Sequence, residues 1–192
     1  MDRRELLKMV ALLTGGVVIG GEVFLSGCKN PDTTATTKTT GAFTDDDIAF
    51  LDEVAETILP KTNTPGAKDA AVGAFMTVMV NDCYTEADQK IFHAGMEKLN
   101  EASNKLNNAG FIKSTAEQRH ALLVNLDKEA KDYQKSKKQE DPNHYFSMMK
   151  QLTLMGFFTS KPGATQALRY VAVPGKYEGC IPYKKGDKAW AT

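Results

Sequence analysis

The chain is 192 residues long and carries 24 basic and 24 acidic side chains, so its formal net charge is zero. A neutral chain lacks the basic excess typical of proteins that bind nucleic acid, so we expect no nucleic-acid partner. Its three cysteines are too few and too widely spaced for an iron–sulfur cluster, and none stands in the Cys-x-x-Cys-His motif that attaches haem c.

Residues 1–27 have the layout of an export signal. Arg3 and Arg4 stand in a short charged head, and an uncharged run containing four glycines follows from Met9 to Gly21. A membrane span needs about 20 apolar residues, so this run disfavours a permanent anchor helix. The stretch RRELLK resembles a twin-arginine export signal, although Asp2 stands where that motif has Ser or Thr. Two arginines also begin many ordinary secretory signals, so that route stays open.

The signal ends in Leu25-Ser26-Gly27-Cys28, which resembles a bacterial lipobox. On this interpretation Cys28 becomes the mature N-terminus and carries the acyl chains that hold the protein on a membrane. The alternative is a signal cleaved elsewhere, with Cys28 an incidental thiol. Residues 28–42 are rich in Thr and nearly free of apolar side chains, so we expect a flexible tether there, followed by one domain over 43–192.

Helix signals dominate the domain. Thr44 precedes three aspartates and a helical pattern of apolar residues, which predicts a helix ended by Pro60. Further helices are expected over residues 70–83, from a capping box at Thr85, from a second box at Ser114 with Glu117, and from Pro142 through Phe158. The helices at 70–83 and 142–158 are apolar enough to be buried. No alternating strand pattern is present, so the predicted fold class is all-α: a bundle of about five helices with an irregular C-terminal tail.

Three blocks carry a more specific resemblance. They are AETILPKTNTPGAKDAAV, LTLMGFFTSKPGATQALRY and LRYVAVPGKYEGCIPYKKGDKAWAT. Together they resemble the gluconate 2-dehydrogenase subunit 3 family of bacterial envelope proteins. The resemblance implies a small, cofactor-free subunit beside a flavin-containing catalytic subunit, often with a cytochrome c subunit. FAD and haem c are then expected in those partners, and the twin-arginine signal is expected to carry the catalytic partner out as well. The export signal and the lipobox at Cys28 together predict a location on the periplasmic side of the envelope, lipid-anchored to a membrane.

The residues themselves predict no catalytic, metal or cofactor-binding site in this chain. Residues 28–192 contain no G-x-G-x-x-G string for a dinucleotide or flavin. Glu117 and His120 have the i, i+3 spacing used in di-iron bundles, but no second pair accompanies them, so we expect surface residues. His93 and His144 are interpreted as core or capping histidines.

Cys83 and Cys180 are the two cysteines that remain after Cys28. In an oxidising envelope two such thiols usually pair, so we expect a disulfide that pins the tail to the helix carrying Cys83. The alternative is two buried free thiols.

The tail is also the predicted partner interface, because rigid aromatic residues gather where the helical pattern has ended. The proposed anchors are Tyr170, Tyr177, Tyr183 and Trp190. The alternative is that many of them pack on their own bundle. Two functions follow: a non-catalytic subunit that escorts, stabilises and tethers a flavin-dependent sugar or sugar-acid dehydrogenase, or a free-standing lipoprotein that binds a small ligand or another envelope protein.

Overall fold

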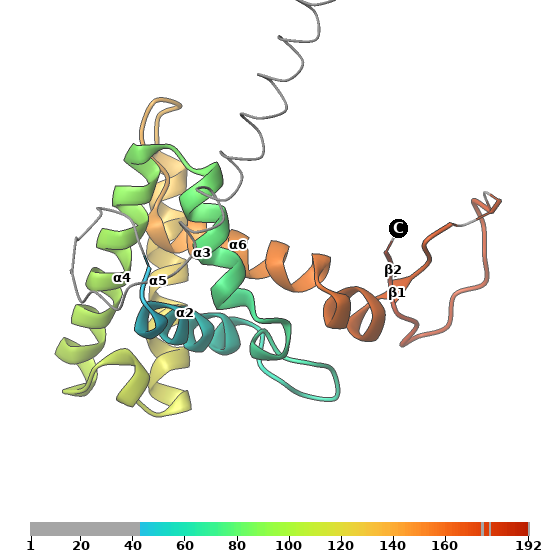
Figure 1. The fold of residues 1–192 in the computed structure, drawn as a ribbon, viewed down its shortest axis with the longest axis horizontal. Helices are drawn as coiled ribbons and strands as arrows, with labels where there is room; N and C mark the ends of the chain where they lie inside the picture. Colours follow the sequence, from blue (N-terminus) through green and yellow to red (C-terminus); the bar gives the residue numbers. More distant parts are fainter. Residues whose placement is uncertain (1–42, 174, 177, 192) are drawn as a thin grey trace, which may run out of the picture. The chain divides into compact units, whose positions relative to one another are not determined.

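A computed structural model of the chain describes residues 43–173, 175–176 and 178–191. The predicted signal and tether, with Arg3, Arg4 and Cys28, lie outside these residues, as does Tyr177. The described part is built from five α-helices (Figure 1): α2 (Asp45–Ile58), α3 (Val72–Cys83), α4 (Glu86–Asn107), α5 (Ala116–Ser136) and α6 (Tyr145–Thr159). The predicted all-α bundle is therefore confirmed. Within the same residues, no helix combines the length and apolarity that crossing a membrane requires.

Shorter elements join the helices and follow them. Single turns η1 (Lys68–Ala70) and η2 (Phe111–Lys113) precede α3 and α5, and a π-helical turn η3 (Gly163–Ala167) follows α6. Two strands of two residues, β1 (Arg169–Tyr170) and β2 (Trp190–Ala191), pair in parallel within the tail. The sequence did not predict this pair, because two residues are too few to show an alternating pattern.

Helix α2 packs against α3, α5 and α6. Its buried face consists of Phe50, Leu51, Val54 and Ala55. Burying a side chain of the size of leucine or phenylalanine contributes about 1.5–3 kcal/mol each, so this one face supplies a substantial share of the stability of the bundle. The tail follows a domain that already has its own hydrophobic core.

The two apolar helices, α3 and α6, are each buried along one face and not all round. Val78 of α3 is exposed, and so are Leu154, Met155 and Phe158 of α6. The prediction that these helices are buried is confirmed for the face of each helix that packs against the other helix and the core. It is wrong for these four exposed positions.

The predicted start of α2 is confirmed. The Thr44 hydroxyl accepts from the Asp47 N–H at 3.2 Å, and the Asp47 carboxylate accepts from the Thr44 N–H at 2.8 Å. This reciprocal capping box satisfies two backbone donors that a helix terminus otherwise leaves unpaired. At α4 the Thr85 hydroxyl likewise accepts from the Asp88 N–H, at 3.2 Å.

Helix α5 begins one residue later than predicted. Its capping box consists of Thr115 and Gln118, whereas Ser114 and Glu117 were expected. The reason is that the Ser114 side chain is buried and lies 2.9 Å from the Ser103 hydroxyl oxygen of α4. Because Ser114 is engaged in the core, the neighbouring threonine caps the helix.

The prediction that Pro142 opens α6 is wrong, because the helix begins at Tyr145. The Pro142 carbonyl accepts from the Tyr133 hydroxyl at 2.9 Å, and the Phe146 N–H donates to Nδ1 of His144 at 3.2 Å. In a helix running through Pro142, that N–H would instead donate to the Pro142 carbonyl. His144 therefore caps α6, which confirms its interpretation as a capping histidine.

Candidate functional site

The ends of the tail are clamped together by β1 and β2. We call residues 169–191 the C-terminal arm. Arg169 lies opposite Trp190 in the parallel pair; the Arg169 N–H donates to the Ala189 carbonyl at 2.8 Å and the Val171 N–H donates to the Ala191 carbonyl at 3.0 Å. The Arg169 guanidinium also lies 3.7 Å from the centre of the Trp190 ring, a cation–π contact. The arm is therefore a closed loop and not a free end.

Its large apolar side chains face solvent. Tyr170 and Trp190 are each 51% exposed, and Tyr183 is 75% exposed. Val173 and Ile181 are exposed as well. Tyr170, Tyr183 and Trp190 are therefore not buried against the bundle in this structure, while Tyr177 lies outside the described residues. Large apolar side chains that gather on one exposed segment are a feature of binding surfaces.

A tight turn at residues 184–187 holds the middle of the arm in shape. The Lys184 N–H donates to the Asp187 carboxylate at 3.0 Å, and the Asp187 N–H donates to the Lys184 carbonyl at 3.0 Å. Gly186 has φ of +99°, a conformation that residues with a side chain rarely adopt. The turn fixes the backbone next to Tyr183 and presents Lys184 and Lys185 to solvent.

The segment between α6 and the arm, residues 160–168, is called the root of the arm here and lies beside the loop that joins α2 to α3. A cavity of about 350 Å³ is lined by Pro162 and Gln166 from the root and by loop residues that include Lys61, Thr64 and Asp69. The Lys188 ammonium donates to the Gln166 carbonyl, which ties the returning end of the arm to η3. The loop therefore forms part of the surface from which the arm begins.

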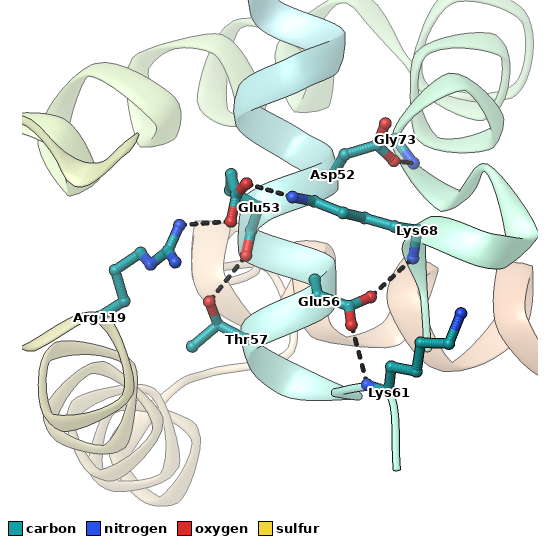
Figure 2. A network of polar contacts seen from close by, with 8 residues as sticks. All are labelled: Asp52, Glu53, Glu56, Thr57, Lys61, Lys68, Gly73 and Arg119. Atoms are coloured by element: carbon teal, nitrogen blue, oxygen red, sulfur yellow. Dashed lines mark hydrogen bonds and ion pairs between the residues drawn. The ribbon is translucent and has the colours of Figure 1, made fainter. Parts of the chain in front are cut away.

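Carboxylates of α2 hold this loop in place, as Figure 2 shows. Glu56 accepts from the backbone N–H groups of Lys61 and Lys68 at 2.8 and 2.9 Å. Glu53 contacts both the Lys68 ammonium and the Arg119 guanidinium of α5. This network was not predicted from the sequence. The one signal for it in the sequence is that the acidic residues of α2 are followed by a loop that contains lysines, proline and glycine.

Two glycines, Gly66 and Gly73, allow the α2–α3 loop and the start of α3 to lie directly against α2. A Cβ at Gly66 would lie 2.5 Å from a carboxylate oxygen of Glu56, and one at Gly73 would lie 2.6 Å from the backbone oxygen of Ile48. The Gly73 N–H donates to the Asp52 carboxylate at 2.7 Å, so the glycine sits against α2. On the far side of the loop, a hydrogen bond from the Lys61 ammonium lowers the pKa of Asp69.

The histidines and acidic residues form no metal-binding cluster in the described part of the chain. Glu117 and His120 are both exposed, as predicted. His93 stacks on Phe43 with ring centres 4.3 Å apart. Across residues 43–173, 175–176 and 178–191, no group of three or more potential metal ligands comes together.

Cys83 and Cys180 are both exposed free thiols in this structure, so the disulfide predicted between them is not formed here. The alternative of buried thiols does not apply either, because both side chains face solvent. The Cys83 sulfur lies 4.0 Å from the Met79 sulfur of the preceding helical turn. The pairing stays a prediction about the protein in an oxidising compartment.

Comparison with known proteins places the chain in a family. Neither a curated protein nor a solved structure matches it. The family model described as gluconate 2-dehydrogenase subunit 3 matches residues 45–175. The match includes the whole helical bundle, the α2–α3 loop and Tyr170, and it stops before Tyr183 and Trp190. Since it spans well over half of the sequence, this chain belongs to the gluconate 2-dehydrogenase subunit 3 family.

Proposed function

We propose that this protein is the non-catalytic small subunit of an envelope sugar or sugar-acid dehydrogenase, which binds, stabilises and tethers a flavin-dependent catalytic subunit. Membership of the family supports a place in a dehydrogenase complex. The FAD belongs to the catalytic partner, and a haem c to a cytochrome subunit where the complex has one.

The observation that carries the proposal is the clamped C-terminal arm. Its backbone is held at both ends and at the turn, while Tyr170, Tyr183 and Trp190 remain exposed. Ordering a flexible segment on binding costs free energy, so a segment that is already ordered binds more tightly for the same contacts. Tyrosine and tryptophan are the residue types that most often dominate the energy of protein interfaces. The described part of the arm combines a held β1–β2 pair and a held turn with exposed tyrosine and tryptophan side chains.

The N-terminal segment supplies the location in this proposal. Arg3 and Arg4 would direct the chain to the twin-arginine route, which carries folded proteins and so allows a docked partner to leave with it. Cys28 would then be acylated and hold the complex on the membrane at its periplasmic side. Residues 28–42 would act as the tether between the acyl chains and the helical domain.

The test replaces Tyr183 and Trp190 by Ala in the full chain, co-expressed with the flavoprotein subunit of its own complex. The matched control replaces Leu106 and Ile112, which are 62% and 50% exposed on the bundle. The measurements are flavin absorption of the co-purified material and the Tm of the small subunit. Central interface aromatics are expected to cost more than about 2 kcal/mol each in binding, so the arm variant should lose the flavoprotein while its Tm stays unchanged.

Retention of the flavoprotein by the arm variant, together with a markedly lowered Tm, would show that the arm is an internal brace. If the unchanged chain itself captures no flavin-containing protein, the subunit proposal fails. The chain would then act as a free-standing lipoprotein that binds a small ligand or another envelope protein. The bundle control should behave as the unchanged chain in both measurements.

A further inference from the structure

The C-terminal arm is basic although the whole chain is neutral. Between residues 169 and 191 the sequence has five basic side chains (Arg169, Lys176, Lys184, Lys185 and Lys188) and two acidic ones (Glu178 and Asp187). This local excess lies on the same segment as the exposed aromatic residues. The excess of positive charge therefore gives information about the charge of the partner surface that the arm binds.

Internal contacts account for both acidic side chains. Glu178 is paired with Lys176 at 2.7 Å, and the Asp187 carboxylate accepts from the Lys184 N–H within the turn. Arg169 stacks on Trp190 and the Lys188 ammonium donates to Gln166, so these two cations serve the clamp. Among the described residues, none of the ion pairs involves the ammonium group of Lys184 or Lys185.

Lys184 and Lys185 follow directly after Tyr183, and the turn fixes the backbone of the two lysines. The result is a rigid tip with a 75% exposed aromatic ring beside two positive charges. We infer that this tip binds an acidic surface of the catalytic subunit, in which Tyr183 enters an apolar pocket and carboxylates at the rim of that pocket face Lys184 and Lys185. The inference rests on the proposed function and specifies the chemistry of the partner.

Charges at the rim of an interface act mainly on the rate of association. Complementary charges raise association rates well above the 10⁵–10⁶ M⁻¹s⁻¹ of neutral surfaces, and the gain falls as salt screens the charges over roughly 8 Å at physiological ionic strength. An anionic lipid surface would also attract lysines and aromatic rings. The protein surface is favoured because the turn fixes the tip in one shape, which a fluid headgroup layer does not require.

The experiment compares two charge reversals in the full chain: Lys184→Glu with Lys185→Glu in the arm, and Lys90→Glu with Lys98→Glu on α4 as the control. All four lysines are exposed. Association with the purified flavoprotein subunit is followed at about 0.05 M and about 0.5 M NaCl. The arm variant is expected to associate about tenfold more slowly than the unchanged chain at low salt and to lose most of that difference at high salt. The α4 variant should be close to the unchanged chain.

Equal rates for the arm variant and the unchanged chain overturn this inference while the proposed function stands. Equal slowing by both variants does the same, because the effect would then come from net charge.

A separate flotation assay uses Cys28→Ser protein with vesicles of phosphatidylcholine and phosphatidylglycerol. Vesicle binding that depends on Lys184 and Lys185, with unchanged flavoprotein association, assigns the tip to lipid and also overturns it. No association by the unchanged chain overturns the proposed function and this inference together.

Discussion

At the residue scale, Gly73 marks a close contact between α2 and the start of α3. A side chain there would meet the Ile48 backbone oxygen and the Asp52 carboxylate, each at 2.6 Å. A backbone oxygen within a packed helix cannot move aside as the end of a side chain can. Gly66 offers the comparison, because the atoms nearest to its missing Cβ belong to the Glu56 carboxylate.

We therefore expect Gly73→Ala to destabilise the protein more than Gly66→Ala. Overpacking of a well-packed site costs about 1–3 kcal/mol, and in a domain of this size each kcal/mol lowers the Tm by roughly 2–4 °C. Gly66→Ala requires only that Glu56 shift, at the expense of its hydrogen bonds to the loop. Thermal unfolding of both variants decides the order. A smaller loss of Tm for Gly73→Ala than for Gly66→Ala would contradict the packing described.

At the scale of elements, Asp127 joins α5 to α6. Its carboxylate contacts the ammonium groups of Lys131 in the next turn of α5 and of Lys150 on α6, each at 2.6 Å. Hydrogen bonds from these two lysines lower the pKa of Asp127 below its ordinary value of 3.8. A carboxyl group with a lowered pKa stabilises the folded state above its unfolded pKa, and this contribution is lost as pH falls through the folded pKa.

Asp127→Asn should therefore lower the Tm at pH 6, where the carboxylate is charged in both states. The difference from the unchanged protein should shrink as the pH falls below 3.8. Glu140→Gln in the exposed α5–α6 loop is the control for the loss of one negative charge at a position that does not join two helices. If the difference in Tm between Asp127→Asn and the unchanged protein stays constant down to the lowest pH at which the protein folds, packing and not charge links α5 to α6 at this position.

The helix ends show how well local sequence signals predict the residue at which a helix begins. The box at Thr44 was predictable because its partners lie three residues apart and nothing else in the fold competes for them. Ser114 and Pro142 present equally good local signals, but contacts with Ser103 and Tyr133 divert them. Local chemistry therefore predicts that a helix begins nearby, and a tertiary contact decides at which residue.

The candidate site divides in the same way. The gathering of aromatic residues in the tail could be predicted from composition alone. The clamp could not, because it pairs Arg169 with Trp190 across the length of the arm. Nor could the loop network, since Glu53 meets Arg119 at a separation of 66 positions. Such contacts depend on how helices pack, and a single amino-acid sequence contains no direct signal for that packing.

At the scale of the whole molecule, the helical domain, the proposed tether and the proposed acyl anchor have separate tasks. In the proposed arrangement Cys28 would attach the protein to the membrane through its acyl chains. Several acyl chains on one cysteine bury many CH₂ groups, each worth about 0.8 kcal/mol, which is enough to hold a soluble domain on a bilayer.

Cys28→Ser should consequently release the protein from the membrane without changing its fold. The measurement is the distribution between membrane and soluble fractions, together with mass spectrometry of the N-terminus for the acyl group. The Tm of the helical domain should stay the same, since residues 43–191 contain its whole described core. If the variant fractionates with the membrane as fully as the unchanged protein, partner binding and not acylation provides the attachment.

The pairing of β1 with β2 has a practical consequence for every capture experiment on this protein. An affinity tag fused close behind β2 would stand near Trp190, on the surface proposed to bind the partner. The exposed segment 138–143 between α5 and α6 offers a different point of insertion, for example between Gln139 and Glu140. A tag placed there leaves both ends of the clamp, and the aromatic ring that belongs to it, as they are in the natural chain.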